Sequence, residues 1–262
     1  NARRLARHGL EDRVAELNAA AVEVAAGVRK NSERPILVAG SIGPTGDLFE
    51  PLGPLTLERG IKVFAEQAKA LAEAGADVLW IETLSSWEEL AAAVQGCSGL
   101  GLPIVATLSF DTNGKTMMGL SPREFGEWWA SQAKPPLAIG ANCGIGPGDA
   151  VAAAFDITTV APDVPVITKA NCGVPLYKSE APEYPVGPDG MADYVELAVR
   201  SGARIIGSCC GSTPSHVAAI RAAVDAGVTG DRPERAEIEQ RLEAAPDQPP
   251  KARRAKRGRR RG

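Results

Sequence analysis

Six short apolar runs alternate with helical stretches along this chain, and this alternation constrains the fold more than any other feature. Each run is nearly continuous in apolar residues, as expected for strands that are buried on both faces. The alternation predicts an α/β fold with one parallel sheet and right-handed crossovers. The predicted strands are residues 36–40, 77–82, 104–110, 137–142, 166–169 and 204–208, and the predicted helices are 57–74, 86–96, 122–133, 148–160, 190–201 and 214–226.

Polar, glycine and cysteine residues follow each predicted strand, and their position distinguishes two kinds of parallel sheet. In a barrel the carboxyl ends of all strands meet at one mouth, where active sites lie, whereas an open sheet spreads them along an edge. The chain has 262 residues, and a single barrel commonly occupies about 250. We therefore predict a (βα)8 TIM-type barrel, of which about six βα units are visible in this chain.

The two ends of the chain differ from this pattern. Residues 1–29 have helical spacing, and the chain begins at Asn1, so we expect a barrel over 1–228 that lacks its opening strands. Residues 229–262 form a polar C-terminal extension, in which 232–244 is predicted to be an exposed helix. Residues 251–262 hold eight of the 29 basic residues and no acid, a composition typical of a disordered tail.

Composition limits the possible partners and the compartment. The sequence has no apolar run of about 18 residues, so we expect no membrane partner. Without the basic tail the chain carries 21 basic and 32 acidic residues, a net charge of −11. We therefore expect no nucleic-acid partner apart from contacts of the tail. Five cysteines, an odd number placed at strand ends, indicate a reducing, cytoplasmic location.

The adjacent cysteines Cys209 and Cys210 are the most informative residues for chemistry. Neighbouring side chains in a strand point to opposite faces, so both sulfurs reach one centre only where the strand ends and the chain turns, and Gly211 follows directly. Two neighbouring thiolates repel each other, and a divalent metal ion would keep both ionised. Cys143 lies at another strand end and can supply a third sulfur across the mouth.

Thiolate ligands favour zinc over magnesium or calcium. Three sulfurs leave one position open on a tetrahedral zinc ion, as in catalytic sites. Cys172 is a rival ligand, because it lies in a second Ala-Asn-Cys-Gly segment 29 positions after the first, and spacing alone also allows a closed four-cysteine site. We expect structural roles for two further residues. Cys97 lies between a helix and a strand, and His216 lies in the first turn of a helix.

Several segments together resemble one enzyme family. The signature of the homocysteine S-methyltransferases resembles the segment Gly207-Ser208-Cys209-Cys210-Gly211-Ser212-Thr213-Pro214-Ser215-His216. The other zinc-ligand motif of this family resembles Ala141-Asn142-Cys143-Gly144. Trp80-Ile81-Glu82-Thr83 resembles the strand-end carboxylate motif, and residues 40–44 and 109–116 match further segments in order. The resemblance extends to about residue 226, but the family's first strand, with an acidic Asp-Gly motif, and its second strand are not visible.

This resemblance implies an eight-stranded barrel and a zinc-dependent methyltransferase that converts homocysteine to methionine, a step of methionine biosynthesis. It implies that Cys143, Cys209 and Cys210 bind zinc and that homocysteine adds its sulfur as the fourth ligand, whereas Cys172 is not a ligand. Glu82 matches the carboxylate that holds the homocysteine amino group, and Ser41 and Asn142 are further candidates for substrate contacts. No catalytic residue beyond the metal centre is predicted.

The methyl donor is not fixed by these motifs. A small onium compound such as betaine is one possibility, because aromatic side chains often hold quaternary ammonium groups. Phe49, Phe110 and Tyr177 are the aromatic candidates in the mouth loops. Other interpretations are a homocysteine-activating piece of a multi-part folate/cobalamin methionine synthase, a non-catalytic truncated zinc-binding barrel, and a different barrel enzyme such as a phosphate-binding lyase.

Overall fold

One curved sheet of six parallel strands forms the centre of the protein. The computed structural model describes residues 1–177 and 182–242. The strands pair in the order β1-β2-β3-β4-β5-β6, so that each strand lies beside its neighbours in sequence. Their bounds are β1 Ala39–Ile42, β2 Val78–Leu84, β3 Ile104–Leu108, β4 Ala138–Cys143, β5 Val166–Ala170 and β6 Ala203–Ser208.

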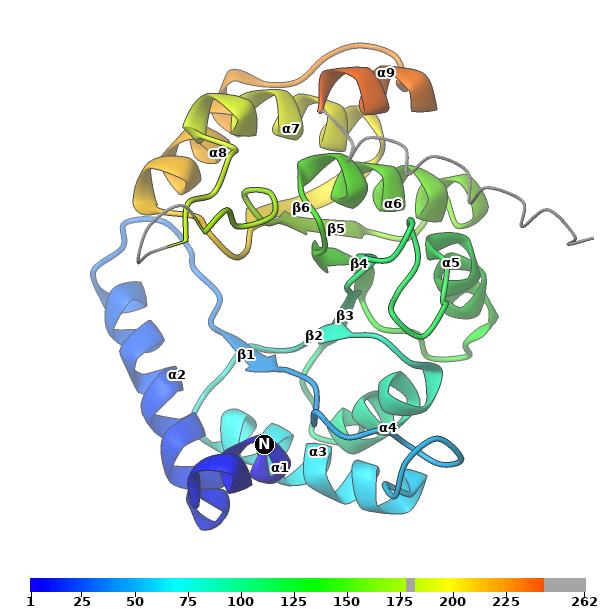
Figure 1. Ribbon diagram of the computed structural model, residues 1–262. Helices are drawn as coiled ribbons and strands as arrows, with labels where there is room; N and C mark the ends of the chain where they lie inside the picture. Colours follow the sequence, from blue (N-terminus) through cyan, green and yellow to red (C-terminus); the bar gives the residue numbers. More distant parts are fainter. Residues whose placement is uncertain (178–181, 243–262) are drawn as a thin grey trace, which may run out of the picture.

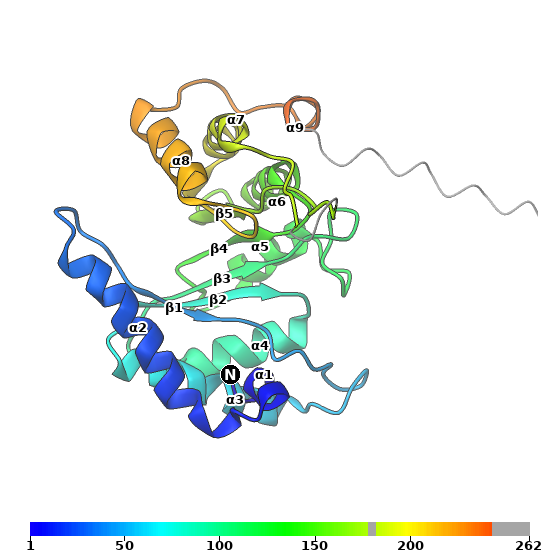
Figure 2. The ribbon, with the colours of Figure 1, turned by 60° about the vertical axis from the view of Figure 1, so that its left-hand side comes forward.

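A helix follows each strand and covers the outer face of the sheet (Figures 1 and 2). These helices are α3 Leu57–Glu73, α4 Trp87–Cys97, α5 Pro122–Ser131, α6 Pro147–Val160, α7 Pro188–Arg200 and α8 Pro214–Ala226. The arrangement confirms the predicted TIM-type architecture with six βα units. In the described part of the chain, β1 and β6 are the two edges of the sheet.

Local sequence explains where these helices begin. The hydroxyl groups of Thr56, Ser86 and Ser121 cap the N-termini of α3, α4 and α5, each accepting a hydrogen bond from a backbone N–H in the first turn. Proline occupies the start of α5, α6, α7 and α8, where its missing N–H costs no hydrogen bond. The predicted helix bounds agree with these starts and ends within about three residues.

The N-terminal region differs from the single predicted helix. Residues Ala2–Leu5 form α1, two 3-10 turns follow, and the long helix α2 covers Val14–Lys30. The break is at Gly9, whose φ of 67° is left-handed and incompatible with a continuous helix. Strand β1 also begins later than predicted, because the Asp77 carboxylate accepts the Val38 N–H and Leu37 is 74% exposed.

The predicted exposed helix within residues 232–244 is shorter and packed against the protein. Helix α9 covers Arg235–Arg241, and Ile238 is fully buried. Arg241 forms ion pairs with Asp193 and Glu196 on α7. Burial of Ile238 and the ion pairs of Arg241 therefore dock this helix on the protein. The predicted basic tail at 251–262 lies outside the described residues. Within those residues, no helix is both long and apolar enough to cross a membrane.

Candidate metal centre

The pairing of three neighbouring strands brings the cysteines of the mouth together. Cys143 is the last residue of β4 and lies opposite Ala170, the last residue of β5. Ala170 in turn lies opposite Ser208, the last residue of β6. The pair Cys209 and Cys210 therefore begins one residue beyond the level of Cys143, and only β5 separates the two groups.

The backbone after β6 turns as predicted, so that adjacent cysteines can serve one centre. The Cys209 N–H donates to the Ala170 carbonyl over 2.7 Å, and the Cys210 carbonyl accepts from the Cys172 N–H over 3.0 Å. Gly211 completes the turn with a φ of 81°. These hydrogen bonds attach the double-cysteine segment to the end of β5.

Cys143 has a φ of 60°, in the left-handed region that residues with a side chain seldom adopt. This conformation costs on the order of 1–2 kcal/mol. Thr83, at the end of β2, has a similar φ of 65°. Such strain is characteristic of functional sites, where the surrounding structure holds the backbone in place.

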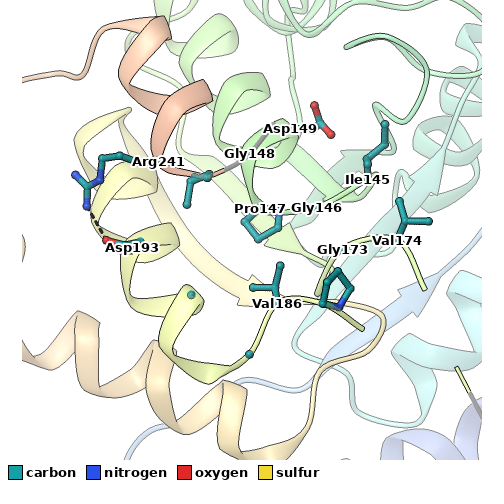
Figure 3. A pocket seen from close by; sticks show the side chains of 14 residues that line it. Ile145, Gly146, Pro147, Gly148, Asp149, Gly173, Val174, Val186, Asp193 and Arg241 are labelled. Atoms are coloured by element: carbon teal, nitrogen blue, oxygen red, sulfur yellow. Dashed lines mark hydrogen bonds and ion pairs between the residues drawn. The ribbon is translucent and has the colours of Figure 1, made fainter. Parts of the chain in front are cut away.

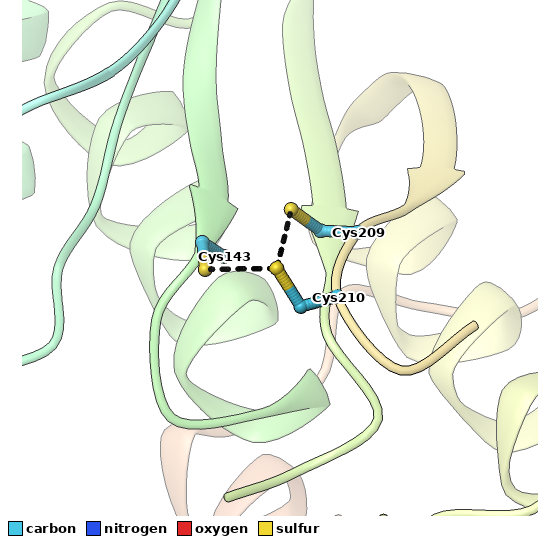
Figure 4. Close-up of side chains that lie close together, drawn as sticks. All are labelled: Cys143, Cys209 and Cys210. Atoms are coloured by element: carbon cyan, nitrogen blue, oxygen red, sulfur yellow. Dashed lines mark hydrogen bonds between the residues drawn. The ribbon is translucent and has the colours of Figure 1, made fainter. Parts of the chain in front are cut away.

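The sulfur atoms of Cys143, Cys209 and Cys210 all lie within 4.8 Å of one another. The Sγ atom of Cys210 is 4.0 Å from the Sγ atoms of both other cysteines (Figure 4). Cys143 and Cys209 are half-buried and Cys210 is exposed. The structure thus assembles the three predicted ligands in a group that a small molecule can reach from the mouth.

The three thiols share negative charge unequally. The pKa of Cys209 is lowered to about 5, mainly because the Cys143 thiol stabilises the Cys209 thiolate by hydrogen bonding. The same hydrogen bond, together with burial, raises the pKa of Cys143, and burial raises that of Cys210. Without a cation the cluster therefore favours one thiolate beside two thiols. A divalent cation would ionise the remaining thiols.

The other two cysteines lie apart from this cluster. Cys172 is fully buried, and its Sγ atom is 3.2 Å from the Ser212 hydroxyl oxygen. Cys97, at the end of α4, is buried, and burial raises its pKa to about 12. Neither joins the sulfur cluster in the described part of the chain. The arrangement therefore disfavours the closed four-cysteine site that spacing alone allowed.

The donor set fits a zinc ion. Zinc prefers soft thiolate ligands, and three protein ligands is the number that catalytic zinc sites use. Cys143, Cys209 and Cys210 provide three such sulfurs without any side chain rearranging across the sheet. A hard cation such as magnesium would find no carboxylate within this group of described residues.

Asn142 connects the sulfur cluster with the end of β2. Its Oδ1 atom accepts hydrogen bonds from the Thr83 N–H over 2.9 Å and the Thr107 hydroxyl over 2.7 Å. Its Nδ2 atom donates to the Thr83 hydroxyl and lies 4.0 Å from the Cys209 Sγ atom. The amide is thus engaged within the protein. Its predicted contact with substrate stays a prediction, and the structure gives it a positioning role.

Glu82 lies in β2 next to Thr83 and has two protein partners. The Ser41 hydroxyl donates to its Oε1 atom, and the Lys169 ammonium group is 2.6 Å from its Oε2 atom. The Lys169 Nζ atom also lies 4.7 Å from the centre of the Trp80 ring. Sequence reasoning missed Lys169. The available signal was a lysine at the end of the predicted strand 166–169.

Two of the three aromatic candidates for the donor site belong to the hydrophobic core. Phe49 and Phe110 are buried in the hydrophobic core, whereas Tyr177 is 77% exposed. The aromatic ring at the cluster is that of Tyr184, which was not predicted. A Cβ atom on Gly211 would lie only 2.3 Å from this ring, so the ring packs directly on the turn after the double cysteine.

His216 has the structural role that was predicted. Its ring Nδ1 atom pairs with Thr213 at the start of α8. Its Nε2 atom is 3.0 Å from the Val186 carbonyl oxygen, in the loop before α7. The histidine therefore joins α8 to the β5–α7 loop beside the sulfur cluster.

A cavity of about 490 Å³ lies on the rim, between the start of α6, the start of α7 and the end of α9 (Figure 3). None of the three clustered cysteines lines it. Burial raises the pKa of Asp149 in its wall, and the Asp193–Arg241 ion pair closes one side. This cavity is thus separate from the sulfur cluster.

The fold and the cluster together define a class of protein: a TIM-type barrel with three clustered cysteine sulfurs at the carboxyl ends of its strands. Comparison with known proteins makes the assignment specific. Residues 1–224 match the family model described as homocysteine S-methyltransferase. The chain therefore belongs to the homocysteine S-methyltransferase family, as the motifs indicated.

Curated relatives include two methionine synthases. That of Mycobacterium tuberculosis is 30% identical over 237 residues, which is 86% of this chain and 19% of the relative. That of Mycobacterium leprae is 30% identical over 197 residues, 71% of this chain and 16% of the relative. The chain thus spans less than a fifth of the length of these relatives.

Solved structures of the homocysteine methyltransferase MmuM from Escherichia coli are also similar. The metallated form has a TM-score of 0.66 at 26% identity and covers 83% of this chain and 74% of its own. The oxidized form has a TM-score of 0.64 at 27% identity, with coverages of 84% and 75%. These structures have the same barrel architecture as the six βα units described above.

Proposed function

We propose that this chain transfers a methyl group from a small onium donor, such as betaine, to the thiol of homocysteine, giving methionine, with zinc as its metal. The observation that carries this proposal is the group of three sulfurs within 4.8 Å at the barrel mouth. Membership of the homocysteine S-methyltransferase family supports the choice of substrate. The five free cysteines support a cytoplasmic location, where thiols stay reduced.

Cys143, Cys209 and Cys210 would hold the zinc ion. When bound, zinc would supply the positive charge that keeps a thiol ionised near neutral pH. A free thiol has a pKa of about 8.5 and is mostly protonated there. Because the protein contributes three sulfurs rather than four, the homocysteine sulfur can join the same centre.

Glu82 is proposed to hold the ammonium group of homocysteine. Its carboxylate is partly accessible, with a side-chain exposure of 19%, and Ser41 fixes one of its oxygens. Asn142 bridges the backbone next to Glu82 and the Cys209 sulfur. The amino-acid end and the sulfur end of the substrate would therefore be aligned by one connected set of side chains, which is the positioning that methyl transfer requires.

The chemical step is a direct displacement. The homocysteine sulfur attacks the methyl carbon of the donor, a new S–C bond forms, and the bond from that carbon to the onium nitrogen or sulfur breaks. The electron pair of that bond stays on the onium nitrogen or sulfur, which becomes uncharged, and the thiol proton has already gone to solvent. Tyr184 packs on the turn beside the sulfurs, where its ring could face a cationic donor.

A second candidate function is the homocysteine-activating part of a larger methionine synthase. It is favoured by the match of 86% of this chain to 19% of the Mycobacterium tuberculosis methionine synthase. In that case a methyl group carried by cobalamin or folate would replace the small onium donor. The residues that bind homocysteine and zinc would be the same.

The test has two parts on the purified chain. Metal analysis is expected to find about one zinc per chain, and homocysteine with betaine, a sulfonium amino acid or methylcobalamin is expected to yield methionine with at least one donor. Zinc without methionine from any donor would support a non-catalytic zinc-binding barrel. Absence of both zinc and methionine would refute the proposal and favour a different barrel enzyme.

A further inference from the structure

An ion pair between Lys169 and Glu82 connects two strands that are not neighbours in the sheet, β5 and β2. We propose that Lys169 binds the carboxylate of homocysteine while Glu82 binds the ammonium group, so that the pair recognises the zwitterionic end of the substrate. This inference rests on the proposed function and adds a specificity-determining residue to it.

The sheet places Lys169 at the level of the metal centre. It lies opposite Asn142 on β4 and Gly207 on β6, and both of those strands lead directly into the clustered cysteines. A Cβ atom at Gly207 would lie 3.2 Å from the Lys169 Cγ atom. Glycine at 207 therefore leaves room for the lysine stem.

The Lys169 side chain reaches the groups of β2 inside the barrel. Its Nζ atom is 2.6 Å from the Glu82 carboxylate and 4.7 Å from the centre of the Trp80 ring. The residue after Glu82, Thr83, is hydrogen-bonded to Asn142, which lies against the Cys209 sulfur. The ion pair and the sulfurs are thus linked through a single side chain.

The pair is accessible enough to be opened by a ligand. The side chains of Lys169 and Glu82 are 23% and 19% exposed, so both charged groups are partly accessible. A zwitterionic amino acid would exchange the one ion pair for two, ammonium with Glu82 and carboxylate with Lys169. All four charges would stay paired, and that arrangement avoids leaving a charge unpaired at the mouth.

This arrangement predicts which thiols the site accepts. A thiol that carries only the ammonium group can pair with Glu82 but offers no carboxylate to Lys169. A thiol that carries only the carboxylate can pair with Lys169 but offers no ammonium group to Glu82. Sites built to bind a charged group reject analogues that lack it. Homocysteine should therefore bind more tightly than 3-mercaptopropylamine, which lacks the carboxylate, and 4-mercaptobutyrate, which lacks the ammonium group.

The experiment measures binding of these three thiols to zinc-loaded protein by calorimetry, alongside KM and kcat for homocysteine. The variant is Lys169→Met, with Lys169→Arg as a conservative rescue and Lys134→Met, an exposed lysine before β4, as the control. Loss of a charge-assisted hydrogen bond is expected to weaken homocysteine and 4-mercaptobutyrate binding by about 10- to 100-fold. Binding of 3-mercaptopropylamine should not weaken, and kcat should change less than KM.

The outcomes separate this inference from the proposed function. If Lys169→Met weakens all three thiols equally, or none, Lys169 only positions Glu82 or has no role, and the inference is overturned. If the variant loses zinc, Lys169 supports the metal centre instead, which also overturns it. If wild-type protein binds no homocysteine, the proposed function fails first. Homocysteine binding that is weak in Lys169→Met but retained in Lys169→Arg supports a direct charge contact.

Discussion

The chain contains the tetrapeptide Ala-Asn-Cys-Gly twice, and the two copies have different roles. In the first, Cys143 is half-buried and its sulfur joins the cluster. In the second, Cys172 is fully buried and its sulfur contacts Ser212. The two asparagines differ in the same way, since Asn142 lies against the Cys209 sulfur whereas Asn171 donates to the Gly144 carbonyl.

The difference comes from the register of the sheet. Cys143 is the last residue of β4 and lies opposite Ala170, so the second tetrapeptide starts opposite the third residue of the first. Cys172 therefore lies two residues beyond the level of Cys143 in the sheet, after the end of β5. Its N–H supports the double-cysteine turn through the Cys210 carbonyl. Identical local sequences therefore give a member of the sulfur cluster in one place and a support for the double-cysteine turn in the other.

The largest effect is expected from breaking the first copy. Replacing Cys143 with alanine removes one of three sulfurs, so zinc should fall well below one per chain. Methionine formation should fall by more than about 100-fold, since loss of an outer contact alone costs about 10- to 100-fold. Metal analysis and a methionine assay measure both quantities.

The matched control is the same change in the second copy. Cys172→Ala should keep its zinc and lose about 1–2 kcal/mol of stability, as expected for a small cavity at a buried site. If Cys172→Ala lost zinc and Cys143→Ala did not, the assignment of the two copies would be reversed.

An intermediate effect is expected for the asparagines. Asn142→Ala removes acceptors for the Thr83 N–H and the Thr107 hydroxyl next to the cluster. Zinc affinity should fall by about 10- to 100-fold, the usual cost of losing a contact that orients ligands. Asn171→Ala removes one hydrogen bond to a loop carbonyl and should cost about 1 kcal/mol of stability. Competition with a chelator measures the zinc affinity of both variants. Equal affinities in Asn142→Ala and Asn171→Ala would contradict this distinction.

The smallest effect concerns thiol reactivity in metal-free protein. The pKa of Cys209 is lowered to about 5, so its thiolate is present above that pH and is lost as the pH falls through 5. Iodoacetamide at pH 6 should therefore modify Cys209 before Cys97, whose pKa is raised to about 12 by burial. Peptide mapping by mass spectrometry locates the label. Labelling of Cys209 that begins only above pH 8 would contradict the charge distribution in the cluster.

Much of the fold could be predicted because local signals repeat. Apolar runs predicted all six strands, and the helical stretches that follow them predicted the helices α3 to α8. Two predictions were wrong, the first for a local reason and the second for a tertiary one. The first helix is interrupted at Gly9, and the helix α9 is docked because Arg241 finds acidic partners on α7.

The site could be predicted in part. The adjacent pair Cys209 and Cys210 predicts a turn and a metal ion bound by both sulfurs, and this prediction needs no structure. The choice between Cys143 and Cys172 required either family resemblance or the register. Lys169 and Tyr184 could not be assigned from sequence, because their positions depend on contacts across the barrel and on the loop before α7.

The most direct test of the central claim is X-ray absorption spectroscopy at the zinc edge, on wild-type protein and the two cysteine variants. The account predicts three sulfur neighbours at about 2.3 Å from zinc, two in Cys143→Ala and three in Cys172→Ala. Addition of homocysteine should raise the wild-type count by one. A zinc ion with nitrogen and oxygen neighbours only, or a sulfur count that Cys143→Ala leaves unchanged, would contradict it.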